Sequence, residues 1–339
     1  MAWIGLDIGG ANLKAAFPAS PDCPAMEMPF PMWTDWETLD QVLGKLACRA
    51  GATDSIAVTM TGELADNFES RRAGVCYIAD TVERVFHGRR IVYYSCDGVW
   101  RRRDDLDQDW DLVAAANWHA TATWSARLLP DRTGAVIDVG STTTDVSLVD
   151  KGVVATDSRN DLQRLSTGEL LYVGAERTPI CGLLSHVQYH QQRIALANEL
   201  FATVGDAAIW QGLAPELPEL TQTADGRPKT RLGSGQRMAR MLCRDLDDLE
   251  SDLIDAVAAQ TITAAAEAIA DTINRQLANS AEPVSHALVV GQGRFLACDA
   301  IKKINSNLEV ALLADAVGEI ASVCGPAHAV ARLASENLA

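Results

Sequence analysis

Positively charged residues are in short supply in this chain of 339 residues. Lys and Arg number 29 against 45 Asp and Glu, which gives a formal net charge of −16 that is spread along the sequence. A chain of this sign repels phosphodiester backbones and anionic headgroups. General binding to nucleic acid or to an anionic membrane is therefore disfavoured. The absence of a helix-turn-helix segment or basic recognition helix also disfavours a DNA-bound regulator.

Long apolar runs and paired cysteines are lacking too. No apolar run reaches about 18 residues, so the sequence predicts no membrane-spanning helix. No basic region precedes the first apolar run, and we expect no secretory signal. The eight cysteines are scattered, without a Cys-x-x-Cys spacing. In a chain of this size that scatter is typical of reduced thiols, which predicts a cytoplasmic protein.

What the sequence does contain is one short motif written twice. The copies read Asp7-Ile8-Gly9-Gly10-Ala11-Asn12-Leu13-Lys14 and Asp138-Val139-Gly140-Ser141-Thr142-Thr143-Thr144-Asp145. Each lies between two short apolar runs, which predicts a strand, a tight turn with glycine and a returning strand. Because each half of the chain opens this way, the pattern indicates an internal duplication of architecture.

The two turns are candidate phosphate-binding sites. Successive backbone N–H groups in such a turn form a concave nest that suits phosphate oxygens, and glycine leaves the approach open. One turn alone would be an ordinary hairpin, whereas two matched copies favour a shared function. We expect Asp7 and Asp138 to hold a cation between them. The expected phosphate-binding residues are Gly9, Gly10, Asn12, Gly140, Ser141, Thr142 and Thr143.

The rest of the pattern predicts two α/β halves. Residues 1–130 are expected to form an N-terminal domain, and residues 131–339 a C-terminal domain with an inserted segment at about 158–245. Apolar runs and periodicity predict strands at 55–60 and 287–290, and helices at 109–129 and 251–277. The stretch 161–192 is expected to be irregular, and 194–209 to form an amphipathic segment.

Two polar stretches of the first half are further candidates. Residues 59–66, which include Glu63, follow a predicted strand at the edge where ligands sit in open α/β sheets. A solvated connection explains their polarity equally well. Asn117 and His119 accompany a run of alanines that allows close backbone approach. Asn117 remains a binding candidate, while close helix packing is the favoured explanation for His119.

In the second half, His186 and His190 stand four residues apart, a spacing that can bind a metal on a helix. No carboxylate lies where a metallopeptidase would need one, so surface or capping histidines are favoured. The residues Gly291 and Gly293 fall between a predicted strand and a helix. A turn of that kind can seat a nucleotide or another planar ring.

Residues 225–240 are locally basic in an otherwise acidic chain. Arg237 and Arg240 could clamp diphosphate oxygens from a mobile loop, because guanidinium groups bind such oxygens bidentately. The alternative is that these arginines pair with the aspartates at 245–248.

The paired turns resemble the phosphate-1 and phosphate-2 motifs of the acetate and sugar kinase, Hsp70 and actin superfamily. The second copy is most similar to the hydantoinase and oxoprolinase branch. This resemblance implies an α/β fold with two RNase H-like (actin/Hsp70/sugar kinase) domains around a central cleft.

Four segments together resemble a narrower family, and the resemblance covers essentially the whole chain. It is the group of tetrahydromethanopterin-linked one-carbon pathway proteins, close to the furan-methanamine synthases of methanofuran biosynthesis. The family implies a transferase in which the phenol oxygen of a tyramine-glutamate displaces diphosphate from an aminomethyl-furanmethyl diphosphate. The segments are 7–14, Thr61-Gly62-Glu63-Leu64-Ala65-Asp66, Ala116-Asn117-Trp118-His119-Ala120-Thr121-Ala122 and Arg237-Met238-Ala239-Arg240-Met241.

The residues suit that chemistry. Mg²⁺ near Asp7 and Asp138, together with Lys14, the turn amides and the basic loop, would stabilise the leaving diphosphate. The phenol needs a base or a hydrogen-bond acceptor, and the choice between Asp145 and Glu63 stays open.

Two other classes of function remain. The same cleft could serve an ATP-dependent small-molecule kinase or a hydantoinase- or oxoprolinase-like amidohydrolase, and a non-enzymatic polymer or sensor is the third class. ATP use is left open because Ala11-Asn12 stands where sugar kinases carry a threonine. The expected partners are a small-molecule diphosphate ester and a phenolic acceptor, without nucleic acid or membrane. Self-association into a homo-oligomer is compatible with the sequence.

Overall fold

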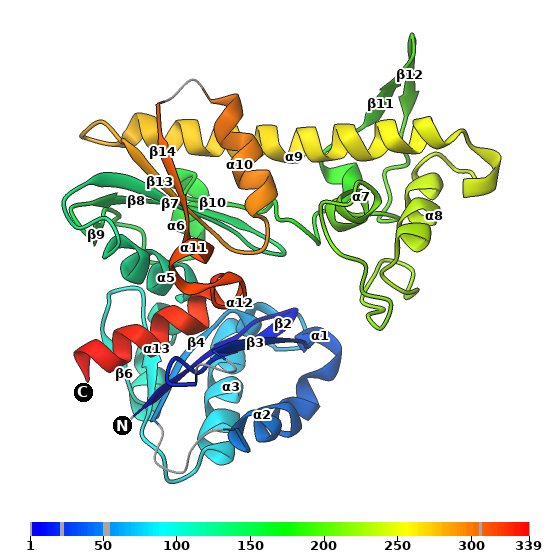
Figure 1. Ribbon diagram of the computed structural model, residues 1–339. Coiled ribbons are helices and arrows are strands. Elements are labelled where there is room, and N and C mark those ends of the chain that lie inside the picture. The colour runs from blue at the N-terminus through cyan, green and yellow to red at the C-terminus, as the bar shows by residue number, and fades with distance from the viewer. Residues whose placement is uncertain (1, 21–23, 50–54, 305–306, 339) are drawn as a thin grey trace.

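The computed structural model describes residues 2–20, 24–49, 55–304 and 307–338. Two mixed sheets form the centres of two lobes, which are stacked one above the other in Figure 1. The first sheet has the strand order β3-β2-β1-β4-β5-β6, and the second has the order β10-β8-β7-β13-β14 with β9 beside β8.

The first sheet opens with the predicted hairpin. Its strands are β1 (Trp3–Ile8), β2 (Asn12–Ala16), β3 (Ala25–Pro29), β4 (Ser55–Met60), β5 (Ile91–Tyr94) and β6 (Trp100–Arg101). The strands β1, β4 and β5 run parallel, so their carboxyl ends meet at one edge. Apolar side chains from α2 and α3 cover one face. The helices of this region are α1 (Met32–Asp35), α2 (Leu39–Ala47), α3 (Arg71–Val85), α4 (Leu106–Val113) and α5 (Asn117–Ala126).

The second sheet repeats this opening. Its strands are β7 (Thr133–Val139), β8 (Thr144–Asp150), β9 (Val153–Val154), β10 (Leu170–Leu171), β13 (His286–Val290) and β14 (Glu309–Leu312). The long helix α9 (Ser251–Asn279) and α10 (Arg294–Lys303) pack on one face. By length and composition α9 could cross a membrane, but half of its most apolar window is buried inside this protein, as in a core helix.

A segment inserted in the second lobe extends to the right of Figure 1, along the far end of α9. It contains the hairpin of β11 (His186–Tyr189) and β12 (Gln192–Ala195), and the helices α7 (Val204–Trp210) and α8 (Arg231–Met241). Both helices pack against α9, which therefore belongs to the core of the lobe and of the insertion alike.

The end of the chain returns to the first lobe. After α6 (Asp161–Thr167) and the elements above, the last helices are α11 (Leu313–Val317), α12 (Glu319–Val323) and α13 (Gly325–Asn337). Helix α13 packs on β1, β4 and α5. An apolar cluster joins side chains of α5 and α13 to both sheets, with Trp3 from the first and Val136 from the second. The strands of the first sheet thus lie before residue 130 and those of the second after it, but α13 crosses back to the first sheet.

Several elements differ from the sequence-based expectations. The single helix expected at 109–129 is two helices, because Ala115 adopts a positive φ of 52° between them. The expected irregular stretch contains α6, and the amphipathic segment at 194–209 is a strand, a loop and α7. The basic stretch is not wholly a loop, since Thr230 caps α8 by accepting a hydrogen bond from the Gly233 N–H. The long helix and the two hairpins are confirmed.

Candidate active site

A cavity of about 620 Å³ lies between the two lobes, and we call it the interlobe cavity. Its walls come from both glycine turns, from the loop after β4, from the start of α5 and from α6. Most of the predicted site residues line it: Asp7, Gly9, Gly10, Asn12, Lys14, Glu63, Asn117, Asp138, Gly140, Ser141, Thr142, Thr143, Asp145 and Gly291.

The two glycine turns have the same backbone geometry. The Gly9 N–H donates to the Asn12 carbonyl oxygen at 3.0 Å, and the Gly140 N–H donates to the Thr143 carbonyl oxygen at 2.9 Å. In each hairpin the aspartate lies seven residues before its cross-strand partner. The matched turns line the cavity from opposite lobes.

The two hairpins differ in the charge opposite each aspartate. Asp7 is paired with Lys14 across β1 and β2, whereas Asp138 is paired with Asp145 across β7 and β8. Directly opposed side chains in antiparallel strands are close enough to interact. One aspartate therefore has a cation as its neighbour and the other has a second carboxylate.

Burial raises the pKa of both acids, and these neighbours modify the rise. Burial raises the pKa of Asp7 to about 6, and Lys14 opposes the rise. Removal from water raises the pKa of Asp138 to about 7, and repulsion from Asp145 adds to the effect. The Asp7 Oδ1 atom is buried without a hydrogen-bond partner. The cavity thus holds negative charge that the protein's own cations only partly compensate.

Asp145 is held by an arginine that the sequence analysis missed. Arg164 of α6 is 2% exposed and forms an ion pair with Asp145. Its guanidinium also lies 3.4 Å from Asp161 and stacks 4.1 Å from the centre of the Trp118 ring. A fixed, buried cation holds the Asp145 carboxylate in one orientation. The sequence analysis did not identify Arg164 because it did not predict helix α6.

Glu63 lies in a different environment. Its Oε1 accepts a hydrogen bond of 2.8 Å from Arg71, while its Oε2 is buried without a partner. Burial raises the pKa of Glu63, against the attraction of Arg71. Arg71 also lies 3.6 Å from Asp161 of the other lobe, so this network spans the cavity.

The third edge of the cavity is the turn after β13. Gly291 has φ of +86°, and a Cβ atom there would lie 2.5 Å from the Asp138 Oδ1 and from the Val139 carbonyl oxygen. Gly293 does not line the cavity; its N–H donates to the Val139 carbonyl oxygen at 2.8 Å. Glycine is required at 291 because a side chain would displace the aspartate.

The structure does not bring the two predicted clamp arginines to the interlobe cavity. Arg237 is 0% exposed, with its guanidinium 2.7 Å from Asp206 and 3.1 Å from Asp225. Arg240 lies 3.1 Å from the other oxygen of Asp225. The expected alternative, pairing of these arginines with the aspartates at 245–248, is not what the structure shows either.

The histidines also lie elsewhere. His119 is 2.9 Å from the Tyr94 hydroxyl through its Nδ1, and burial lowers its pKa to about 4, which agrees with the packing explanation. His186 lies in β11 and His190 in the turn that follows it, so the helical metal spacing does not apply. His190 approaches Glu250 and Asp252 in an exposed group.

Arg177 is a second site residue that the sequence analysis did not single out. The Glu176 and Arg177 N–H groups donate to the Ser141 carbonyl oxygen, at 3.1 and 2.8 Å, which ties the segment to the second glycine turn. Its guanidinium lies 4.5 Å from the centre of the Trp33 ring of the first lobe. Within the described part of the chain, Arg177 forms no ion pair with a carboxylate. A cation beside the glycine turns is thus left for an anionic ligand.

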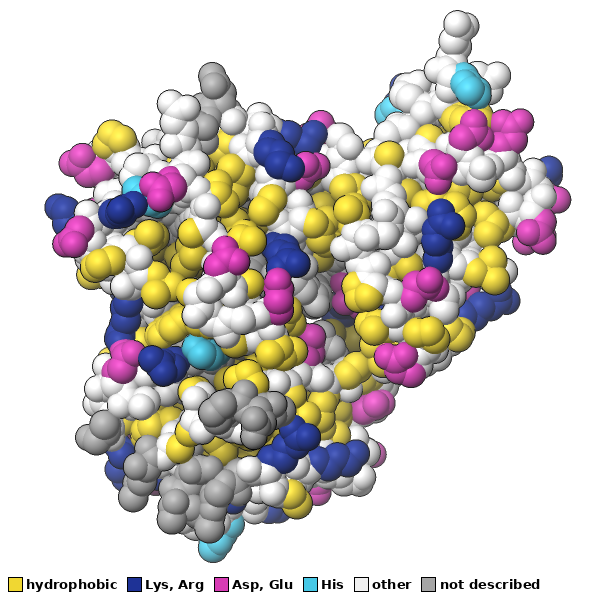
Figure 2. Space-filling model, in the orientation of Figure 1, with side chains coloured by type: hydrophobic (Ala, Val, Ile, Leu, Met, Phe, Trp, Pro, Cys, Tyr) yellow, Lys and Arg dark blue, Asp and Glu magenta, His cyan; other side chains and the backbone are white. Residues whose placement is uncertain are grey.

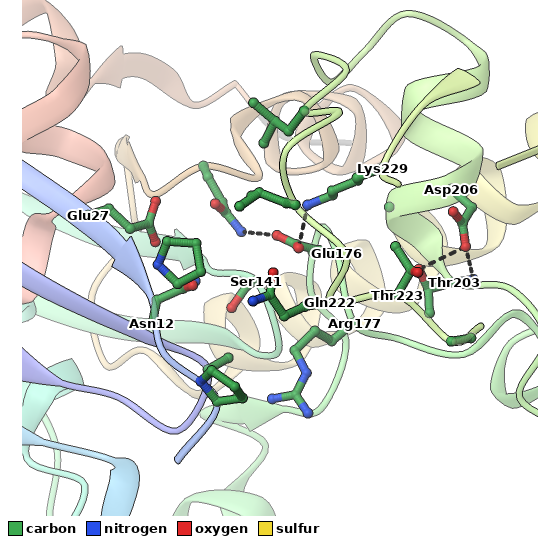
Figure 3. A pocket seen from close by; sticks show the side chains of 18 of the residues that line it. Asn12, Glu27, Ser141, Glu176, Arg177, Thr203, Asp206, Gln222, Thr223 and Lys229 are labelled. Atoms are coloured by element: carbon green, nitrogen blue, oxygen red, sulfur yellow. Dashed lines mark hydrogen bonds and ion pairs between the residues drawn. The ribbon is translucent and has the colours of Figure 1, made fainter. Parts of the chain in front are cut away.

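A second cavity, of about 760 Å³, joins the first (Figure 3). We call it the side cavity. The two share Ala11, Asn12, Trp33, Ser141 and Arg177 in their walls. The arrangement offers two adjoining compartments, the first lined by phosphate-type turns and acids, the second reaching from the β2–β3 edge to the insertion.

One face of the molecule shows no comparable focus of charge. On the face shown in Figure 2, basic and acidic side chains are interspersed among apolar ones, and Lys and Arg do not gather into one patch.

Comparison with known proteins agrees with the expected fold. The model of the hydantoinase/oxoprolinase family matches residues 54–336. A glucokinase of the ROK family from Streptomyces griseus, solved with glucose and AMPPNP, superposes with a TM-score of 0.52 at 12% identity, covering 99% of this chain and 100% of its own. The two-lobed α/β fold of the sugar kinase and actin superfamily is therefore confirmed, and at this identity the likeness speaks for the fold alone.

Two curated relatives bear the same name, (4-{4-[2-(γ-L-glutamylamino)ethyl]phenoxymethyl}furan-2-yl)methanamine synthase. The protein from Methanocaldococcus jannaschii is 29% identical over 99% of this chain and 98% of its own length. The protein from Methanococcus vannielii is 26% identical over 61% of this chain and 93% of its own. The resemblance stated from the sequence motifs is confirmed by these matches.

Proposed function

This chain belongs to the hydantoinase/oxoprolinase family, and from that premise we propose that it is a transferase of methanofuran biosynthesis. It joins the phenol oxygen of a tyramine-glutamate to an aminomethyl-furanmethyl diphosphate and releases diphosphate. The observation that carries the proposal is the end-to-end match to a synthase named for the resulting phenoxymethyl ether.

In this reaction the phenol oxygen forms a bond to the furan-methyl carbon, and the bond from that carbon to the diphosphate oxygen breaks. The electron pair leaves with diphosphate, so negative charge must be stabilised there. The turn amides, Lys14 and Arg177 are the groups placed to bind it. Burial lowers the pKa of Lys14, but attraction by Glu27, Asp7 and Asp138 outweighs it, so the pKa is raised and Lys14 stays protonated.

A divalent cation fits this site. The Asp7 Oδ1 atom is buried without a partner, and burial raises the pKa values of Asp7 and Asp138 to about 6 and about 7. Mg²⁺ is commonly held by one or two carboxylates together with substrate phosphates. We propose that Asp7 and Asp138 hold it, and when bound it would neutralise charge on the diphosphate oxygens.

The phenol proton needs an acceptor, and we assign this role to Glu63. Asp145 is engaged in an ion pair by the buried Arg164, so its carboxylate is already occupied. Glu63 keeps one oxygen free of partners and has a raised pKa. A carboxylate with a raised pKa is the better general base of the two at neutral pH.

Mass spectrometry of the purified protein with the furanmethyl diphosphate and γ-glutamyltyramine tests the proposal. We expect the coupled ether and free diphosphate in the absence of ATP, and no ether from Asp7→Asn or Asp138→Asn. A parallel reaction with ATP tests the kinase and amidohydrolase alternatives. Phosphorylated acceptor or hydrolysed amide, formed only with ATP and without ether, would replace the proposed function by one of them.

We further propose a cytoplasmic location. All seven cysteines in the described part of the chain are free thiols, as a reducing compartment would leave them.

A further inference from the structure

The side cavity is the larger of the two, and most of its lining residues have no place in the proposed binding of diphosphate. It begins at Arg177 and Trp33, where it meets the interlobe cavity, and extends to the insertion. A ligand lying in it would therefore have one end beside the glycine turns and the other end against the insertion (Figure 3).

One part of its wall is apolar. Trp33 and Leu200 are 37% and 49% exposed and line this cavity from its two sides. Leu217 and Leu220 of the insertion and Pro31 of the first lobe line the same cavity. These side chains offer a surface for an aromatic ring and a short hydrocarbon spacer.

The other part carries a pair of opposite charges. Lys229 and Glu176 form an ion pair, with their side chains 13% and 30% exposed (Figure 3). The second Glu176 oxygen lies 3.5 Å from the Gln292 amide nitrogen. A partly buried ammonium beside a carboxylate presents both signs at one place, which matches the head group of an amino acid.

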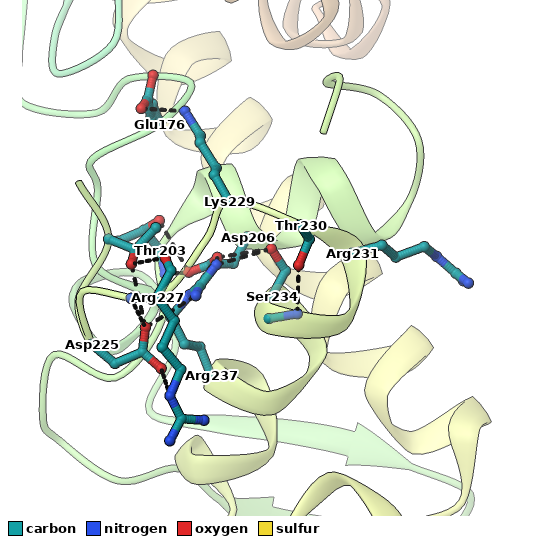
Figure 4. Close-up of polar contacts among 12 residues, drawn as sticks. Glu176, Thr203, Asp206, Asp225, Arg227, Lys229, Thr230, Arg231, Ser234 and Arg237 are labelled. Atoms are coloured by element: carbon teal, nitrogen blue, oxygen red, sulfur yellow. Dashed lines mark hydrogen bonds and ion pairs between the residues drawn. The ribbon is translucent and has the colours of Figure 1, made fainter. Parts of the chain in front are cut away.

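The basic segment of the insertion fixes this wall. The Leu217 N–H donates to the Lys229 carbonyl oxygen at 2.8 Å, which closes the loop that carries Leu220. The buried Arg237 bridges Asp225 of that loop to Asp206 of α7 (Figure 4). A buried, doubly paired guanidinium is costly to break, so the loop is held in place before any ligand arrives.

We propose that the side cavity is the binding site of the acceptor, a phenol with an amino-acid tail. The ring and its ethyl spacer lie against Trp33, Leu200 and the leucines of the loop. The α-carboxylate and α-ammonium of the tail bind Lys229 and Glu176. The phenol oxygen then faces the interlobe cavity at the junction marked by Arg177. This inference rests on the proposed function, because it names the second substrate of the same site.

The test compares the binding of two acceptors to the wild-type protein and to a variant. Isothermal titration measures the Kd of γ-glutamyltyramine and of tyramine, which lacks the amino-acid tail, for the wild-type protein and for Lys229→Met. We expect the wild type to prefer γ-glutamyltyramine, and the variant to lose that preference by a factor on the order of 10 to 100. Glu176→Gln is the second variant, and Lys302→Met, an exposed lysine of α10, is the matched control.

Each outcome decides a separate point. Equal binding of the two acceptors by the wild type, or an undiminished preference in both Lys229→Met and Glu176→Gln, would overturn the acceptor site. Thermal unfolding of each variant shows whether a lost preference comes from collapse of the loop. If Lys229→Met unfolds the loop, the binding preference of Glu176→Gln decides whether the acceptor site stands. The proposed function fails separately, if the wild type forms no ether while still distinguishing the two ligands.

Discussion

At the scale of single residues, the site depends on which side chain stands opposite each cleft aspartate. Lys14 compensates Asp7, whereas Asp145 repels Asp138, and Arg164 compensates Asp145 instead. The lobes are therefore alike in backbone and unlike in charge. A site with this asymmetry binds a cation and an anion together more readily than either one alone.

Asp138→Asn tests the charge balance through stability. The folded-state pKa of Asp138 is about 7 against an unfolded value of 3.8, so the folded protein keeps a proton that the unfolded chain has lost. Its contribution to the free energy of unfolding therefore falls as the pH rises from about 4 to 7, and stays low above 7. We expect Asp138→Asn to raise Tm by several degrees at pH 8 and to change it little at pH 4.

Thermal unfolding with and without Mg²⁺ extends the same measurement. Mg²⁺ should raise Tm of the wild type at pH 8, and raise it less in Asp138→Asn, because the variant lacks one of the proposed ligands. Asp131→Asn, on the exposed turn before β7, is the control. An Asp138→Asn variant less stable than the wild type at pH 8 would contradict the charge assignment.

Arg177 gives a second prediction at this scale. Its guanidinium lies on Trp33 at the junction of the cavities. Charge-assisted hydrogen bonds to phosphate contribute about 1.5–3 kcal/mol each. Arg177→Gln should therefore weaken the binding of inorganic diphosphate roughly 10-fold or more, measured by isothermal titration, whereas Arg332→Gln on α13 should not. Equal affinities would mean that the leaving group does not reach this arginine.

The sequence revealed the residues that lie within one motif, and missed those that are brought in from another. Asp7 and Asp138 were predictable because the strand, the glycine and the carboxylate are adjacent in the chain. Arg164 and Arg177 were not predictable, because their positions at the site depend on segments whose structure the periodicity did not predict. Arg237 misled for a related reason: its buried partners Asp206 and Asp225 are 31 and 12 residues away.

At the scale of elements, short connections shape the site more than the long helices do. Residues Ala114, Ala115 and Ala116 interrupt what periodicity predicted as one helix, and this break lets α5 begin at Asn117 beside the cavity. Periodicity predicted α9 well, since a helix of 29 residues averages out local exceptions. It could not predict β12 and α7, whose apolar residues face different partners.

Gly291→Ala tests the turn after β13. The added Cβ would lie 2.5 Å from the Asp138 Oδ1, at a backbone φ of +86° that alanine also disfavours. Gly212→Ala is the matched control, because its φ is +71° and nothing lies within 4 Å of its Cβ position. Both variants should lose stability from backbone strain, but only Gly291→Ala should also lose Mg²⁺-dependent stabilisation. If Mg²⁺ stabilises both variants equally, the turn at Gly291 does not control the position of Asp138.

At the scale of the whole molecule, the two lobes share one joint. Helices α5 and α13 pack together, and the apolar cluster around them takes Trp3 from the first sheet and Leu288 from the second. Interlobe pairs at the cavity, such as Arg71 with Asp161, lie away from this cluster. The chain's halves could be recognised from the repeated hairpin. That the last helix would cross to the first sheet could not, because no local pattern encodes a partner some 300 residues away.

Gly5→Ala tests that joint in the intact chain. Gly5 of β1 lies under α13, and a Cβ atom there would be 1.8 Å from the Ala327 carbonyl oxygen, so the helix must move off the sheet. Overpacking of this kind costs about 1–3 kcal/mol. Gly44→Ala in α2, where nothing lies within 4 Å, should instead be neutral or stabilise by up to about 1 kcal/mol. Urea unfolding followed by tryptophan fluorescence compares the two, and limited proteolysis should cut Gly5→Ala faster between α11 and α13. If both variants unfold at the same urea concentration, the contact of α13 with β1 does not contribute to the stability of this joint.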